Sequence, residues 1–532
     1  MKIKYLLSIC AAAVLSFSAC VGDLDVQPLD PNVTTAEIAY ATPGAFNQSI
    51  AKIYAVWAMS GQDGEGSTDI AGLDPGNAQL LRSYWNLQVI TTDECKNAWS
   101  NSWVPEINGM LYSSTKNESI EGVYQRCMFT VALCNEFILQ ANASSVLDAA
   151  QKTQYVAEAR FNRALAYEVL MDLYATPPFI TEENYSLAPS ALTRADLFDW
   201  IETELNDCRD NLPTPSAVEY GRASQGAVDF LLARMYLNAE VFKGEAMYTE
   251  CIAACNRLFT EGYALSTTYA NLFKADNNIT SSKEIIFPIV FDGTKTKTWG
   301  GMTYLIASSR SGKAVDLNRD GVNEGWDGNR ATSGLTSKFD TFDPAMRDAA
   351  MLTDARGIFD SNGRSEAITT TSEGTFVTEG WAVYKFTNVK SDGSLCEDTT
   401  FPETDFPMFR LGDAYLMYAE AVVRGGSGAT KAEAVTLVNK LRERGYGGAG
   451  GDISESDLDL DFVLDERARE LYWEGTRRTD LVRFGKYTGS QYVWDFKGGV
   501  ATGVAVNSYK NVFPIPVSDL SVNGNLQQNP GY

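Results

Sequence analysis

The sequence predicts a mostly α-helical fold, built from repeated helix hairpins and interrupted by one loop-rich insertion that carries the ligand site. Apolar residues recur at helical spacing in paired stretches, with small and aromatic residues where two helices would approach closely. Between residues 266 and 407 the composition changes to Gly, Ser, Thr, Asn and Asp with scattered aromatics. The pattern is typical of a degenerate tetratricopeptide-like array, although no strict repeat of about 34 residues is present.

The predicted helices follow one another as hairpins, separated by breaks at glycine-rich positions such as Gly244. The expected helical stretches are a first pair within 119–174, a second pair at 223–238 and 246–259, a third pair at 413–423 and 431–444, and a further helix at 462–474.

The insertion at residues 266–407 is predicted to contain loops and a few short strands. Such irregular segments often carry binding residues on a rigid frame. The earlier stretch at residues 61–103 has the same character, with Gly, Asp and Asn between its aromatics. We therefore expect it to lie beside the insertion.

The amino-terminal residues predict a signal peptide at 1–19. Lys2 and Lys4 precede a short apolar run that ends in small residues and Cys20, and the run falls short of the roughly 20 residues that span a bilayer. Cys20 stands where a lipoprotein signal peptidase would cut, so we expect its lipidation and an anchor made of acyl chains alone. The alternative is an ordinary secretory signal with a chance cysteine. Residues 20–532 are predicted to form a single domain.

Composition excludes several functional classes. The net charge of −24 makes nucleic acid and anionic lipid poor partners. The absence of histidine excludes Ser-His-Asp catalysis, Cys-His catalysis and His-ligated zinc. A glycosidase carboxylate pair could still exist among the 68 acidic residues, because sequence spacing neither reveals nor excludes one.

The cysteine pattern favours buried thiols over a redox or metal site. Nine cysteines less Cys10 and Cys20 leave seven, an odd number without a CxxC motif. Cys251 and Cys255 have the i,i+4 spacing of one helix face. Near the end of the chain, Arg477, Arg478 and Asp480 are interpreted as an ion-pair network that fixes helix packing rather than as catalytic groups.

Several blocks of sequence resemble the SusD/RagB family of outer-membrane lipoproteins, and the resemblance covers nearly the whole chain after residue 19. The blocks include RFNRALAY at 160–167, GRA at 221–223, LLARMYL at 231–237, LMYAEA at 416–421, EGTRRTDLVRFG at 474–485, FPIP at 513–516 and QNPGY at 528–532. Residues 92–95, 295–301 and 492–499 are most similar to starch-binding members of the family.

The resemblance implies a non-catalytic protein on the outside of the outer membrane. It would capture starch or maltooligosaccharides and pass them to a SusC-like TonB-dependent transporter. A SusD-type binder of another polysaccharide or of a peptide is the alternative, and an enzyme is a distant third hypothesis. Neither nucleic acid nor direct membrane contact beyond the lipid anchor is expected.

The resemblance also indicates site residues. Trp99, Trp299 and Trp326 lie in irregular sequence and match an arc of aromatic platforms, with Trp299 in place of a tyrosine. Polar contacts are expected from Arg82 and Asp74, while a third contact, an asparagine in the family, aligns with Ser102 and has Asn101 beside it.

Two calcium sites compete as hypotheses. An EF-type loop would use Asp316, Asn318, Asp320 and Asp327, with Asp in place of the usual Glu at position twelve and without flanking helices. The resemblance implies another set, made of Asp276, Glu403 and Asp405. Calcium would serve a structural role in either place.

Overall fold

The computed structural model describes residues 36–342, 347–361 and 363–532. The predicted signal peptide and Cys20 lie outside these residues. Within the described ranges, no helix combines enough length with enough apolar character to cross a membrane.

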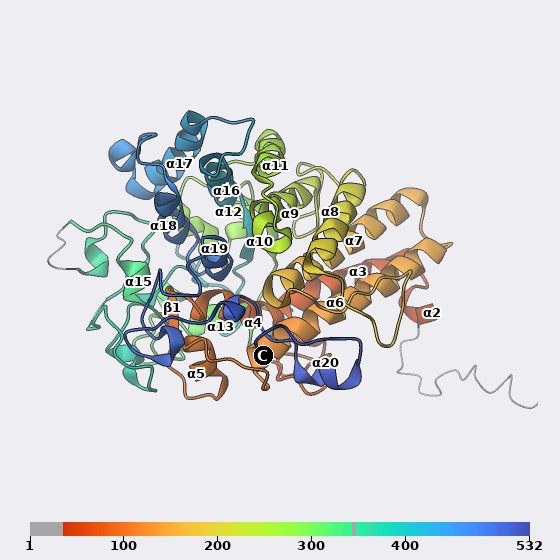
Figure 1. Ribbon diagram of the computed structural model, residues 1–532, viewed down its shortest axis with the longest axis horizontal. Helices are drawn as coiled ribbons and strands as arrows, with labels where there is room; N and C mark the ends of the chain where they lie inside the picture. Colours follow the sequence, from red (N-terminus) through yellow and green to blue (C-terminus); the bar gives the residue numbers. More distant parts are fainter. Residues whose placement is uncertain (1–35, 343–346, 362) are drawn as a thin grey trace, which may run out of the picture.

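Helix hairpins form the scaffold of the protein (Figure 1). The longer helices are α3 (Pro43–Ala58), α6 (Glu118–Ala143), α7 (Ala149–Tyr174), α8 (Arg194–Arg209), α9 (Gln225–Leu237), α11 (Tyr248–Thr260), α16 (Leu411–Val423), α17 (Lys431–Tyr446) and α18 (Leu460–Leu471). Successive helices pack as the pairs α6 with α7, α9 with α11, and α16 with α17, while α11 also packs on α16. These pairs confirm the three hairpins predicted from the sequence.

Shorter elements connect and cover the hairpins. They are α2 (Ala36–Ala39), α4 (Leu80–Trp85), α5 (Trp103–Asn108), α10 (Ala239–Lys243), α12 (Asn277–Thr280), α13 (Gly301–Ala307), α14 (Leu317–Asp320), α15 (Ser333–Thr336), α19 (Arg477–Arg483) and α20 (Val517–Val522). The remaining turns of helix are the π-helix η1 (Asn86–Ile90) and the 3-10 helices η2 (Tyr269–Phe273), η3 (Ala349–Met351), η4 (Thr375–Val377), η5 (Ala449–Gly451), η6 (Lys497–Gly499) and η7 (Ser508–Asn511).

Two parts of the scaffold differ from the prediction. Helix α8 packs against α7 and was missed, although Leu197, Phe198, Ile201 and Leu205 give it an apolar face. The stretch at 61–103 is irregular only in part, because α4 and η1 form one buried helical run from residue 80 to residue 90. The polar residues of this run, among them Arg82, Asn86 and Gln88, are buried and bond to other segments, so they do not mark a solvent-exposed face.

The insertion is rich in loops, as predicted, and contains short antiparallel strand pairs. The pairs are β1 (Cys95–Asn97) with β3 (Asn329–Ala331), β2 (Ile285–Ile289) with β6 (Phe406–Arg410), and β4 (Phe359–Asp360) with β5 (Ala382–Val383). Because β1 comes from the stretch at 61–103 and β3 from the insertion, the two irregular regions lie side by side. In Figure 1 the insertion, green to teal, lies below and beside the blue carboxy-terminal helices.

One hydrophobic core runs through both the scaffold and the insertion, from Val56 to Leu526. All cysteines among the described residues are free and buried, in agreement with the interpretation as buried thiols. Cys251 and Cys255 face the backbone of α16, at the carbonyl oxygens of Met417 and Ala414.

Buried ion pairs join the carboxy-terminal helices to the rest of the molecule. Arg477 on α19 donates two hydrogen bonds of 2.7 Å to the Asp93 carboxylate, just before β1. Burial alone would raise the pKa of Asp93, but the Arg477 guanidinium holds it well below its ordinary value. Arg478 pairs with Asp172 on α7 at 3.0 Å. The structure thus agrees with a packing role for Arg477, Arg478 and Asp480.

We predict that Arg477→Met destabilises the protein severely, by about 3–5 kcal/mol, because the buried Asp93 carboxylate would lose its guanidinium partner and keep only the hydrogen bond from Tyr492 and the more distant Lys338 ammonium. The free energy of unfolding in urea measures this effect. Lys486→Met is the control, since Lys486 pairs with a largely exposed Asp461 and such pairs contribute about 0–1 kcal/mol. Equal effects of the two substitutions would contradict the prediction.

Candidate binding site

Three tryptophans from distant parts of the sequence form one row at the surface. Trp99 and Trp326 are 227 positions apart, yet their ring centroids lie 6.5 Å from each other. The centroid of Trp299 lies 6.3 Å from that of Trp326, and Trp326 is tilted by 47° against each neighbour. Trp299 is 37% exposed, and the other two rings are half-buried. We call these three residues the tryptophan row.

The β1–β3 ladder positions two members of the row. Asn97 pairs with Asn329, and the Ala98 amide donates a 2.9 Å hydrogen bond to the Gly328 carbonyl oxygen. The indole Nε1 of Trp99 then donates to the Trp326 carbonyl oxygen at 2.7 Å. A Cβ atom on Gly328 would lie 2.8 Å from the Trp99 ring, so this close approach requires glycine.

Helix α13 connects the third member to the other two. Trp299 stands just before α13, where the Gly301 amide donates to the Gln79 side-chain oxygen at 2.9 Å. At the opposite end of α13, the Ala307 carbonyl oxygen accepts a 2.8 Å hydrogen bond from the Trp326 amide. One short helix therefore fixes the positions of both Trp299 and Trp326.

Arg82 lies beneath the row and is only 4% exposed. Its guanidinium carbon is 4.1 Å from the centroid of the Tyr304 ring and 5.5 Å from that of the Trp99 ring. It donates to the side-chain oxygen of Asn77 at 2.6 Å and to the Trp299 carbonyl oxygen at 3.3 Å. Burial lowers the pKa of Arg82 from its ordinary value. Among the described residues its Nε has no hydrogen-bond partner.

The row and Arg82 line an open depression of about 460 Å³. The same depression is lined by Asn77, Ser100, Asn101 and Glu373. Asp74 is exposed beside it, and its carboxylate accepts hydrogen bonds from the amides of Gly76 and Asn77 at 2.9 and 2.6 Å. Ser102, the position indicated by the family resemblance, is exposed before α5 and does not line the depression.

Sequence reasoning missed several polar groups around the depression. Asn77 and Glu373 line it, and Glu118 lies at the start of α6 near Arg82. Burial, followed by the nearby Asp74 carboxylate, raises the pKa of Glu118. The position of Asn77 between Asp74 and Arg82 in the sequence was a signal that could have identified it. No local pattern marks Glu118 and Glu373, because only the tertiary fold brings them to the depression. The depression therefore offers aromatic faces with planar hydrogen-bonding groups between them, which is the chemistry that sugar rings and hydroxyls require.

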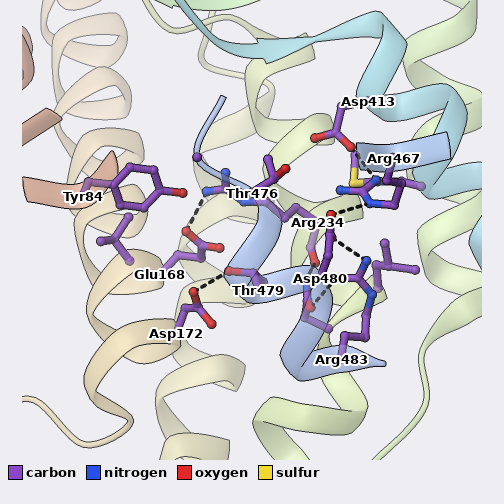
Figure 2. Close-up of a pocket in the computed structure, with 15 residues that line it drawn as sticks. Tyr84, Glu168, Asp172, Arg234, Asp413, Arg467, Thr476, Thr479, Asp480 and Arg483 are labelled. Atoms are coloured by element: carbon purple, nitrogen blue, oxygen red, sulfur yellow. Dashed lines mark hydrogen bonds and ion pairs between the residues drawn. The ribbon is translucent and has the colours of Figure 1, made fainter. Parts of the chain in front are cut away.

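A second cavity, buried between helices, is shown in Figure 2 and has room for little more than water, about 30 Å³. Its charged groups bond to one another. Arg467 contacts Asp413 at 2.7 Å and Asp480 at 2.9 Å, while Arg234 contacts Glu168 at 2.6 Å. This cavity belongs to the ion-pair network of the scaffold and is too small for a sugar.

Neither predicted calcium set converges on one point. Asp276 accepts hydrogen bonds from Ser391, while Asp405 accepts from Tyr220 and the Phe291 amide. Burial raises the pKa of Asp405 to about 7. Glu403, the third residue of that set, accepts from the Glu397 amide at 3.2 Å.

In the EF-type set, the Asp320 carboxylate is taken by Arg310 at 2.9 Å and Arg319 at 2.8 Å. Asp316 accepts from the amide of Asn318, and Asp327 lies in the left-handed backbone region. The part of the chain that the structure describes contains no group of three acidic or cysteine side chains able to hold a metal ion.

Calcium binding therefore stays a prediction. If calcium binds, the melting temperature should rise as its concentration exceeds the dissociation constant, and chelation should lower it. Differential scanning calorimetry with calcium and with EDTA measures this. Loss of the response in Asp276→Asn would assign one set, and loss in Asp316→Asn would assign the other. Identical melting curves in calcium and EDTA would contradict both.

Comparison with known proteins connects this geometry to a family. A family model described as the SusD family matches residues 283–532. The chain is 34% identical to the starch-binding protein SusD of Bacteroides thetaiotaomicron, with 100% of each chain covered. It is also 23% identical to a SusD-like protein of Bacteroides ovatus, covering 92% of this chain and 83% of that one.

Solved structures share the fold at lower identity. A SusD superfamily protein from Parabacteroides distasonis gives a TM-score of 0.69 at 23% identity, covering 94% of this chain and 100% of that one. Surface glycan-binding protein A from Bacteroides thetaiotaomicron, in complex with laminarihexaose, gives a TM-score of 0.68 at 18% identity. The match covers 92% of this chain and 99% of that one.

Proposed function

The chain belongs to the SusD family, and from this premise we propose that it captures starch or maltooligosaccharides at the cell surface. Its relative SusD is named a starch-binding protein, and like SusD this chain is a binding protein and not an enzyme. The observation that carries the proposal is the tryptophan row, three neighbouring indoles in which the plane of Trp326 is tilted by 47° against each of the other two.

A row of platforms that do not share one plane fits a curved sugar chain better than a flat one. Stacking a sugar face on an indole removes apolar area from water at roughly 25 cal/mol per Å². Each hydroxyl that exchanges water for a protein partner adds only about 0.5–1.5 kcal/mol. The indoles should therefore dominate affinity, and a curved α-glucan would follow them without the cost of bending. A flat, extended glycan would need platforms that share one plane.

We predict that Trp299→Ala weakens maltooligosaccharide binding at least about ten-fold, and that Trp326→Ala weakens it as well. The melting temperature of Trp299→Ala should barely change, because this side chain is 37% exposed and supports little of the core. Isothermal titration calorimetry measures the affinity. Tyr185→Ala is the matched control, since Tyr185 is 76% exposed and does not line the depression. Unchanged affinity in both tryptophan variants would contradict the assignment.

The alternative, a SusD-type binder of another polysaccharide or of peptides, makes a different prediction in a glycan panel. Affinity electrophoresis against soluble starch, laminarin and a β-1,4-glucan should show retardation by starch and none by the β-1,4-glucan. A cyclic maltooligosaccharide should compete better than a short linear one. Retardation by a β-glucan alone would overturn the starch assignment while leaving the family intact.

Export and partnership complete the proposal. Cys20 would carry the lipid anchor at the outer face of the outer membrane, and a SusC-like TonB-dependent barrel would receive the glycan. The signal-like residues before Cys20 and the family membership support this. Cys20→Ala should release the protein from the membrane fraction, and gentle detergent extraction of the wild type should co-purify a TonB-dependent barrel. Retention of Cys20→Ala in the membrane, or recovery of a monomer alone, would count against it.

A further inference from the structure

A third cavity, of about 540 Å³, lies in the insertion and shares no lining residue with the depression at the tryptophan row. Its wall includes Lys274 after η2, Asn318 and Arg319 on α14, Phe359 and Asp360 on β4, and Tyr384 after β5. We call it the insertion cavity. Unlike the cavity in Figure 2, it is large enough for a sugar ring.

Several polar side chains in the wall of the insertion cavity can form hydrogen bonds with a ligand. Among the described residues, neither the Lys274 ammonium nor the Asn318 side-chain amide has a hydrogen-bond partner. The Arg319 guanidinium lies 4.1 Å from the Tyr384 ring and is held in place by Asp320 at 2.8 Å. The Tyr384 hydroxyl donates to the Asp360 carboxylate at 3.2 Å. The wall thus presents an ammonium, a guanidinium, an amide and a carboxylate.

These residue types repeat those of the first depression. There, Trp299 lies beside Arg82, Asp74 and Asn77, so an aromatic ring stands with a guanidinium, a carboxylate and an amide. In the insertion cavity, Phe359 stands with Arg319, Asp360 and Asn318. Since Phe359 also packs against Tyr472 with centroids 5.2 Å apart, it offers less stacking area than the tryptophan row.

The two sites are structurally joined. The Asp327 amide, next to Trp326, donates to the Arg310 carbonyl oxygen at 3.0 Å. The Arg310 guanidinium lies 4.1 Å from the Tyr384 ring, the same distance as that of Arg319. The loop that presents Trp326 therefore also forms part of the frame of the insertion cavity.

We propose that the insertion cavity is a second, weaker glucan subsite that holds another segment of a long chain already bound on the tryptophan row. This inference rests on the proposed function. A neutral sugar fits the wall better than an anionic one, because Arg319 is paired with Asp320 and Lys385 with Glu474, and the Asp360 carboxylate balances the charge of the Lys274 ammonium. A long polymer that contacts both the tryptophan row and the insertion cavity binds more tightly than one that contacts the row alone. A short oligosaccharide reaches only the row, so its affinity does not depend on the insertion cavity.

The test is the double variant Lys274→Ala/Asn318→Ala. The control is Lys313→Ala, because Lys313 is an exposed residue just before α14 and does not line the cavity. Amylose should bind the double variant about ten-fold more weakly, since two hydrogen-bonding groups are lost, while maltoheptaose affinity stays near the wild-type value. Lys313→Ala should bind both ligands like the wild type. Arg319→Lys, which keeps the charge but loses the planar guanidinium, serves as a second variant, and thermal melts verify folding.

Two failures are distinguishable. If the double variant and Arg319→Lys bind amylose as tightly as the wild type while maltoheptaose still binds, the subsite is overturned and the proposed function stands. If the wild type binds neither amylose nor maltoheptaose, the proposed function is overturned and the subsite with it.

Discussion

The buried pair of Arg477 and Asp93 is the contact on which the site geometry depends. Asp93 precedes β1, the strand that leads to Trp99, and Arg477 begins α19, so the pair fixes the site to the carboxy-terminal helices. Removing two charges from water costs several kcal/mol, and only close, well-aligned partners recover that cost. The geometry of the pair is therefore tightly constrained, and the strand next to it is constrained as well.

The same principle extends through the insertion, which has short strands and little regular structure of its own. Arg410 at the end of β6 contacts Glu470 at 2.7 Å and Glu474 at 2.6 Å, and Lys385 reaches Glu474 at 2.6 Å. Arg356 contacts Glu466 at 2.8 Å, and together with Arg469 and Arg442 it lowers the pKa of that carboxyl to about 2 against the effect of burial. These charges from α18 and the residues after it give loops the rigidity that a larger sheet would otherwise supply.

A rigid frame allows large aromatic side chains to remain at the surface. Beneath the tryptophan row, Asn97 bonds to Asn329 at 2.7 Å and the Tyr304 hydroxyl to Asn86 at 2.8 Å, so these buried side chains hold one another in place. Trp99 and Trp326 also pack against the hydrophobic core, where the Trp99 ring meets the buried rings of Trp103 and Tyr304 edge-on, and these contacts help to fix their orientation. The depression is consequently formed before any ligand arrives, which reduces the ordering cost of binding.

The sequence predicted those elements whose pattern is local. The paired helices show a 3.6-residue period, and the tryptophans stand in irregular sequence that resembles a family site. The run at 80–90 was missed because its polar residues, such as Arg82 and Asn86, are buried and do not mark a solvent-exposed face. Glu118 and Glu373 were missed because only the fold brings them to the depression. Likewise, the spacing of Asp316 and Asp320 suggested a calcium loop, but Arg310 and Arg319, one before and one within that loop, occupy the Asp320 carboxylate.

The central claim is that a curved α-glucan lies on the three indoles. A crystal structure of the protein with a cyclic maltooligosaccharide tests it most directly. The account predicts successive glucose rings stacked on Trp299, Trp326 and Trp99, with hydroxyls near Arg82 and Asn101. A ligand bound elsewhere on the surface, with the three indoles uncovered, would contradict it.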